Sequence, residues 1–125
     1  LGQIEGGFVQ GQGWLTMEEV NWNSKGKIMT VSPSTYKIPA VSDMPKKFNI
    51  EIFKQGINQE KVVNKAKTTG EPPLMLAMSV FFAIKDAISS VGNYKKIPVL
   101  DAPATPEKIL MSLNELNNRN NPNKN

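Results

Sequence analysis

One nearly unbroken apolar run constrains the fold of this chain more than any other feature. It lies in residues 68–90, TTGEPPLMLAMSVFFAIKDAISS, where Ser79 is the only polar residue of the stretch 74–84. A helix that is apolar on every side is typical of a helix enclosed by protein. The stretch is about half the roughly 20 residues that a membrane-spanning helix needs, and Lys85 and Asp86 end it. The sequence therefore predicts a long, buried central helix.

The start of this central helix carries the residue of greatest chemical interest. Pro72 and Pro73 fix a helical φ and lack N–H groups that a first turn could not pair, so they predict an abrupt helix start. Glu71 lies immediately before them, and Gly70 allows a tight turn of the backbone. A carboxylate at such a place is more often a helix cap, stabilised by about 0.3 to 1 kcal/mol, than a catalytic group. From the residues alone, the cap is the favoured interpretation, and a catalytic role for Glu71 is the alternative.

The composition excludes several kinds of chemistry. The chain has 125 residues, of which 39% are hydrophobic, so it is one domain or a piece of one. It contains no cysteine, which excludes disulfides, thiolate nucleophiles and iron–sulfur ligation by this chain. It also contains no histidine, which excludes the usual zinc sites and histidine-based triads. A general base in this chain must therefore be a carboxylate, a lysine or a tyrosine.

The positive charge of the chain does not indicate a nucleic-acid surface. The net charge is +4, but the lysines are scattered, and the only adjacent pairs are Lys46 with Lys47 and Lys95 with Lys96. Nucleic-acid binding normally needs basic residues clustered on one face beside aromatic side chains. The sequence starts at Leu1 without a recognisable secretory signal, and the chain is interpreted as a fragment. We expect a cytoplasmic protein with no nucleic-acid and no membrane partner.

The N-terminal residues 2–17 predict a glycine-rich helix. Their apolar residues fall on one helical stripe, although five glycines each cost about 1 kcal/mol relative to alanine. Gly7 and Gly11 are four residues apart, which lets another backbone come close on that side. The glycine spacing does not match a dinucleotide-binding loop. Gln3 is a candidate ligand contact, but a glutamine at a helix start is more often a capping side chain.

Two segments between the predicted helices favour β-structure. Residues 18–31 predict a β-hairpin that turns at residues 23–26, and residues 47–54, KFNIEIFK, alternate in the manner of a half-buried strand. Three prolines between these segments predict an irregular, rigid loop in residues 33–45.

The C-terminal part of the chain predicts a last helix and a tail. The triplet TPE at residues 105–107 supplies a cap, a first-turn proline and an acid, so a helix is expected from Pro106 to about Asn117. The polar residues 118–125 predict a disordered tail. The predicted fold is α+β: a small, mostly antiparallel sheet packed with the glycine-rich helix, the long buried central helix and the C-terminal helix.

Four blocks of sequence in a fixed order resemble one known family. They are GQIEGGFVQGQGWLT, PSTYKIPA, GEPPLMLAMSVFFAIKDAI and DAPATPEKIL. Together they closely resemble the C-terminal part of the molybdopterin-binding subunit of xanthine dehydrogenases, in the aldehyde oxidase and xanthine dehydrogenase family of molybdenum hydroxylases, with details closer to the bacterial members. The resemblance extends to about Leu113 and implies that residues 1–117 are the C-terminal portion of a molybdopterin-binding domain. One departure is Gln12, which stands where an apolar residue is usual.

The resemblance implies roles for three residues. It implies that Glu71, the glutamate of GEPP, is the catalytic base, that Gln3 contacts the molybdenum centre, and that the backbone at Gly70 approaches the cofactor. The implied substrates are hypoxanthine and xanthine, and the implied cofactor is molybdenum–molybdopterin. A 2Fe–2S cluster and FAD are expected on other domains or subunits, which would be the partners of this chain together with the rest of the molybdopterin-binding subunit.

The chain alone is expected to bind no cofactor and to be inactive. Two alternatives stay open from the sequence. One is a domain of an aldehyde oxidase-like enzyme or another azaheterocycle hydroxylase, since the base is shared. The other is a non-catalytic folding or interaction module.

Overall fold

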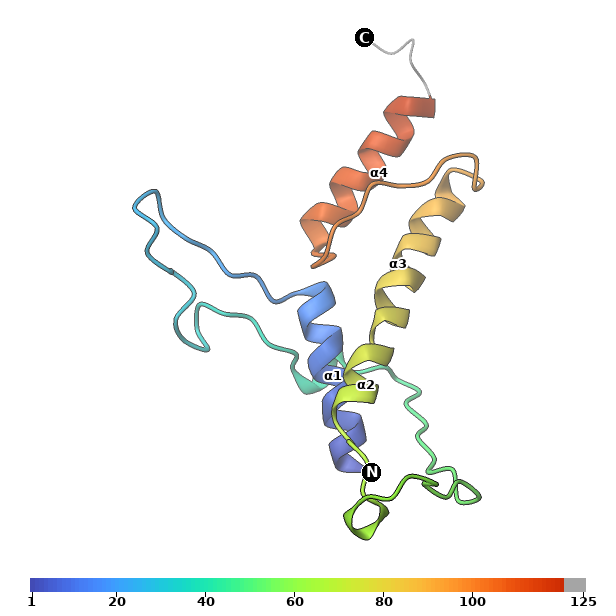
Figure 1. Cartoon of the computed structure of the whole chain (residues 1–125). Coiled ribbons are helices and arrows are strands. Elements are labelled where there is room, and N and C mark those ends of the chain that lie inside the picture. Colours follow the sequence, from blue (N-terminus) through green and yellow to red (C-terminus); the bar gives the residue numbers. More distant parts are fainter. Residues whose placement is uncertain (121–125) are drawn as a thin grey trace.

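The described part of the protein is a set of helices joined by long irregular segments. The computed structural model describes residues 1–120 (Figure 1). Its α-helices are α1 (Gly2–Thr16), α2 (Glu71–Leu76), α3 (Met78–Val91) and α4 (Pro106–Asn120). Two 3₁₀ turns, η1 (Val41–Asp43) and η2 (Val63–Lys65), interrupt the connection between α1 and α2.

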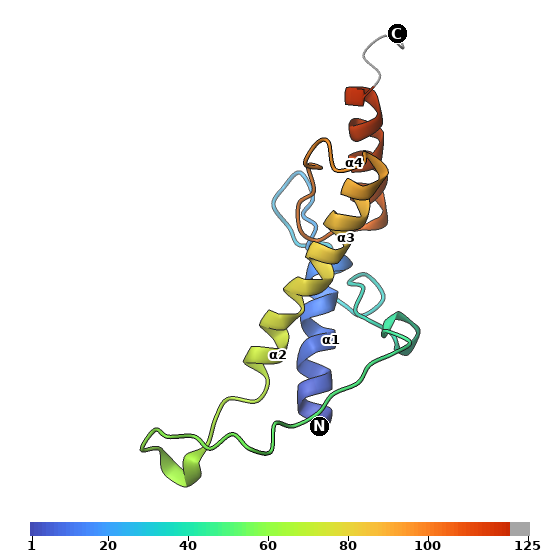
Figure 2. The same cartoon turned by 90° about the vertical axis from the view of Figure 1, so that its right-hand side faces the viewer.

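The helices form two neighbouring pairs along the molecule. Figures 1 and 2 show α2 beside α1, α3 continuing beyond α2, and α4 beside α3. The segment after α1 extends away from the helices on one side, and the segment between η1 and α2 lies near the N-terminal end of α1 (Figure 1). This arrangement brings the start of α2 next to α1, although 68 residues lie between Gly2 and Glu71 in the sequence.

The predicted antiparallel sheet is wrong, because residues 1–120 contain no β-strand. The turn predicted at residues 23–26 does form, with φ of +75° at Gly26, but the flanking residues share only one isolated bridge, between Trp22 and Ile28. Residues 47–54 also lie outside any regular element. A two-stranded hairpin is marginal unless further strands or a helix cover it, and Trp22 and Ile28 of the hairpin stay 57% and 44% exposed. The α+β fold class is therefore replaced by an open helical arrangement.

The central apolar run is helical as predicted, but it is neither continuous nor buried within this chain. It consists of α2 and α3, which meet at Ala77. Ala77 and Ile88 are buried, whereas Leu76 and Phe82 are 65% and 56% exposed. An all-apolar pattern indicates that something covers the helix, but it does not identify the covering chain.

A small core joins α3 and α4. Its buried members are Ile88, Leu100 and Ala104, and the half-buried apolar side chains of Phe81, Ile84, Ile109 and Leu113 pack against them. Leu116 of α4 is also buried, and its side chain lies against Gly92 at the end of α3. This core fixes the C-terminal helices but lies away from the residues with predicted chemistry.

By length and composition, residues Glu71–Val91 also satisfy the requirements of a membrane-spanning helix, with a mean hydropathy of 1.7. The helical run is thus longer than the apolar stretch 74–84, which by itself is too short to span a membrane. The core helix of a soluble protein satisfies the same requirements. Lys85 and Asp86 lie inside the run, and a charge at the centre of a span costs about 2.5–3.5 kcal/mol or more. These charges, and the packing of α2 on α1, favour a helix that is covered by protein.

The last helix begins at Pro106 as predicted and ends later than predicted. The helix α4 continues to Asn120 and so includes residues 118–120 of the segment for which a disordered tail is predicted. Residues 121–125 of that predicted tail lie outside the described residues.

Candidate functional site

Two glycines of α1 allow α2 to pack directly against its backbone. A Cβ atom built on Gly7 would lie 2.7 Å from the carbonyl oxygen of Gly70. A Cβ atom on Gly11 would collide with the carbonyl oxygen of Leu74 and would lie 2.7 Å from the Cβ atom of Ala77. The prediction that small residues four apart admit another backbone is therefore confirmed. This close approach stabilises a helix whose glycines make it weak in isolation.

A groove lies where α1 and α2 meet, and all three predicted site residues line it. The α1–α2 groove has a volume of about 500 Å³ and is lined by Gly2, Gln3, Gly6, Gly7, Gln10, Gly70, Glu71 and Leu74. Gln3 comes from the first turn of α1, whereas Gly70 and Glu71 come from the start of α2. The fold thus brings together residues that are about 70 positions apart in the sequence.

Glu71 is the first residue of α2, and the local sequence fixes this position. Pro72 and Pro73 are in the first turn, and the Leu74 N–H donates to the Gly70 carbonyl oxygen at 3.1 Å. Pro73 is buried, which anchors the turn. The Glu71 side chain is exposed and has no hydrogen-bond or ion-pair partner within residues 1–120. A carboxylate held in this way is available to a ligand of the groove.

The structure gives Gly70 a different role from the one that its sequence suggested. Its φ is −92°, an ordinary value for any residue, so the turn itself does not require glycine. Its carbonyl group instead lies against Gly7, and a Cβ atom at Gly70 would meet nothing within 4 Å. The glycine therefore leaves open space in the groove.

Two further glycines leave the same groove open from the side of α1. A Cβ atom on Gly2 or Gly6 would meet no atom within 4 Å, in contrast to Gly7 and Gly11. The glycine surface can therefore be approached closely by a flat ligand, with hydrogen-bonding side chains at its edges. An open surface, two amides and one carboxylate fit a heterocyclic, polar cofactor such as a pterin.

Gln10 and the open glycine Gly6 also line the groove, and neither was predicted from the sequence. Residues 3, 7 and 10 follow the i, i+4, i+7 spacing of one helical face, so the position of Gln3 and the contact at Gly7 together indicate Gln10. That signal was present in the sequence, but it required knowledge that Gly7 faces α2.

The loop after α1 is fastened to the C-terminal half of that helix. Gln12 is 8% exposed, and its Nε2 donates to the Asp43 carbonyl oxygen at 2.7 Å. Tyr36 Oη donates to Glu18 Oε2 at 2.5 Å. This hydrogen bond to Glu18, followed by burial and the negative charge of Glu18, raises the pKa of Tyr36 above 10.0. The Gln12 amide thus ties α1 to Asp43, although within the described residues its buried Oε1 accepts no hydrogen bond.

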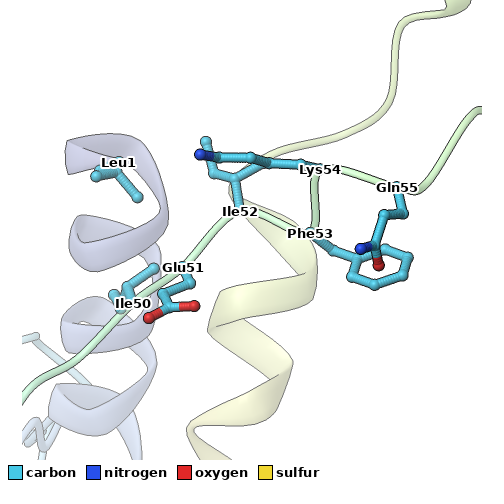
Figure 3. A pocket seen from close by; sticks show the side chains of 7 residues that line it. All are labelled: Leu1, Ile50, Glu51, Ile52, Phe53, Lys54 and Gln55. Atoms are coloured by element: carbon cyan, nitrogen blue, oxygen red, sulfur yellow. The ribbon is translucent and has the colours of Figure 1, made fainter.

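A hollow larger than the α1–α2 groove lies elsewhere. It has a volume of about 740 Å³ and is bordered by Leu1 and by residues 50–55 (Figure 3). Figure 3 shows Phe53 and Gln55 at the end of this segment away from Leu1. None of the predicted site residues borders this hollow. Size alone does not make it the candidate site, because the α1–α2 groove is where predicted catalytic and binding groups converge.

Comparison with known proteins identifies the family. Residues 1–45 match the model of the molybdopterin cofactor-binding domain. The chain is 46% identical over 123 residues to a xanthine dehydrogenase of Oryza sativa subsp. japonica, covering 90% of this chain and 9% of that protein. It is 47% identical over 114 residues to the xanthine dehydrogenase/oxidase of Rattus norvegicus, covering 87% of this chain and 8% of that protein. The chain thus spans less than a tenth of the length of these relatives, and it belongs to the family of molybdopterin-binding xanthine dehydrogenases.

Proposed function

We propose that this chain supplies the catalytic base, Glu71, to the molybdenum site of a larger enzyme that hydroxylates hypoxanthine and xanthine. The observation that supports the proposal is the convergence of Gln3, Gly70 and Glu71 on one groove. The names of the relatives favour xanthine as a substrate over an aldehyde. The resemblance to bacterial members stays a prediction.

The proposed mechanism assigns a separate task to each side of the groove. Molybdenum–molybdopterin, when bound, supplies the redox centre that takes up the two electrons removed from the purine carbon. Gln3 binds the cofactor through its side-chain amide. Gly70 and Gly6 leave space for the cofactor. Glu71 accepts a proton at a carboxylate oxygen, because it is the one ionisable side chain among the described residues that line the groove.

The rest of the enzyme must contribute the other parts of this site. We propose that the remaining molybdopterin-binding subunit covers the exposed apolar side chains of α2 and α3, such as Met75, Leu76 and Phe82. The 2Fe–2S cluster and FAD that carry electrons away are assigned to other domains or subunits in the cytoplasm. The 125-residue chain alone is therefore expected to be inactive.

Substitution of Glu71 by Gln in the complete enzyme tests the proposal. The variant keeps the size and hydrogen-bonding capacity of the side chain and removes the proton acceptor. Purine oxidation is expected to fall by a factor of about 10² to 10⁴, the usual contribution of a general base, while molybdenum content stays close to the wild-type value. Glu60, in an exposed loop outside the groove, provides a matched control as Glu60→Gln.

A further inference from the structure

The α1–α2 groove contains a second amide that the proposed function does not use. Gln10 borders the groove on α1, and it follows Gln3 by seven residues. Two turns of helix place their Cα atoms about 10 Å apart on one face. Gly7 lies between them at the point of contact with Gly70, so the two amides are on opposite sides of that contact.

The surroundings of Gln10 favour a ligand on its groove side. Gln10 is exposed, and no side chain within residues 1–120 is hydrogen-bonded to it. It also borders a hollow of about 270 Å³ whose other lining residues are largely apolar: Val9, Trp14, Glu18, Ile38 and Pro39. The one carboxylate there, Glu18, already accepts the hydrogen bond from Tyr36. Gln3 and Glu71 line the α1–α2 groove together with Gln10, and their side chains also have no hydrogen-bond partner within the described residues.

The chemistry of an amide defines what Gln10 can bind. A glutamine side chain presents an N–H donor and a carbonyl acceptor side by side. A lactam edge of a heterocycle presents the complementary acceptor and donor. Gly6, one turn before Gln10 on α1, leaves open space in which a flat ring can lie. We propose that Gln10 binds the lactam edge of a planar heterocycle in this groove, a proposal that rests on the proposed function of the site.

Two molecules of the proposed reaction carry a lactam edge: the pterin of the cofactor and the purine substrate. The two sources predict different consequences for a variant at Gln10. Loss of a contact to the pterin lowers the amount of cofactor that the enzyme retains. Loss of a contact to the purine weakens substrate binding and leaves the cofactor content unchanged.

The test uses Gln10→Leu in the complete enzyme. Leucine has a helix propensity close to that of glutamine, so α1 is expected to form. Gln10→Glu is made in parallel, because it keeps the shape and polarity of the side chain and replaces its donor by an acceptor. Gln59→Leu, in an exposed loop outside the groove, is the matched control.

Circular dichroism checks the fold of each variant. Molybdenum and pterin contents are measured first, and kcat and KM are then measured with xanthine and with unsubstituted purine, which has the same ring system but no lactam.

The expected effect is that of one neutral hydrogen bond, roughly two- to tenfold. If the pterin is the partner, pterin content falls by that factor in both variants, while kcat per bound molybdenum is unchanged. If the purine is the partner, KM for xanthine rises by that factor and KM for unsubstituted purine does not. Unchanged pterin content together with unchanged KM for xanthine overturns the proposal, as does an equal change of KM for both substrates without loss of pterin. A normal Gln10→Leu enzyme beside an inactive Glu71→Gln enzyme rejects only the role of Gln10, whereas an active Glu71→Gln enzyme rejects the proposed function itself.

Discussion

Gly7 of α1 lies directly against the backbone carbonyl group of Gly70, so that a Cβ atom on Gly7 would be 2.7 Å from that oxygen. This contact fixes the distance between α1 and the first residue of α2. The spacing of Gln3 and Glu71 across the groove therefore depends on the absence of a side chain at Gly7.

Replacement of Gly7 by Ala is expected to separate α1 from α2. The added methyl group cannot avoid a backbone atom, and such overpacking typically destabilises by about 1–3 kcal/mol. Hydrogen–deuterium exchange of the complete subunit should show faster exchange in Gly2–Thr16 and Glu71–Leu76. Exchange that equals the wild-type rate in both helices would show that the close contact is not needed.

Replacement of Gly6 by Ala is expected to leave the packing of α1 on α2 intact and to lower the cofactor content. The added methyl group meets no atom of this chain, and alanine favours the helix by about 1 kcal/mol over glycine. Exchange in α1 should therefore stay equal or become slower. The methyl group nevertheless occupies the α1–α2 groove, so the molybdopterin content of the purified enzyme should fall several-fold. A Gly6→Ala enzyme with full cofactor content would place the cofactor away from this part of α1.

The helices could be predicted from the sequence because their signals are local. Two prolines lie in the first turn of α2, and Pro106 begins α4 after Thr105, whose Oγ1 accepts a hydrogen bond from the Lys108 N–H. The glycine-rich α1 is weaker in isolation, yet its small residues four apart correctly predicted the close approach of a second backbone.

The absence of the predicted sheet could not be foreseen from the sequence, because strand formation depends on a partner. The alternation of residues 47–54 is real, but the apolar Phe48 packs its ring on Phe8 of α1, with ring centroids 5.3 Å apart, and forms no ladder. The prediction that the central run is buried was wrong for a related reason. Its apolar pattern predicts a cover, but within residues 1–120 side chains such as Leu76 and Phe82 stay exposed.

The candidate site was predicted unevenly. Gln3, Gly70 and Glu71 came from the resemblance to a family, and the structure brings these three residues into one groove. Gln10 was not identified, because a glutamine on a helix is usually only solvated. Its position at the groove becomes visible when Gly7 is known to face α2, since that contact defines which side of α1 borders the groove.

The Tyr36–Glu18 contact predicts a change at alkaline pH. Because the folded protein raises the pKa of Tyr36 above 10.0, the contact contributes its full stability below about pH 10 and loses it as the pH rises through the raised value. In the Tyr94→Phe variant of the 125-residue chain, Tyr36 is the only tyrosine, so ultraviolet absorbance of tyrosinate reports its ionisation alone. Glu18→Gln in this background removes the charge and weakens the hydrogen bond, which should lower the pKa of Tyr36. Identical titration curves for the two proteins would exclude the contact in solution.

The most direct measurement of the central claim is kcat/KM for xanthine of the Glu71→Gln enzyme, compared with wild type and with Glu60→Gln at equal molybdenum content. If Glu71 is the base in the groove, kcat/KM falls by a factor of about 10² to 10⁴ in Glu71→Gln alone. If Glu71→Gln and Glu60→Gln both retain the wild-type value, the carboxylate at the start of α2 is only a helix cap and the catalytic assignment is wrong.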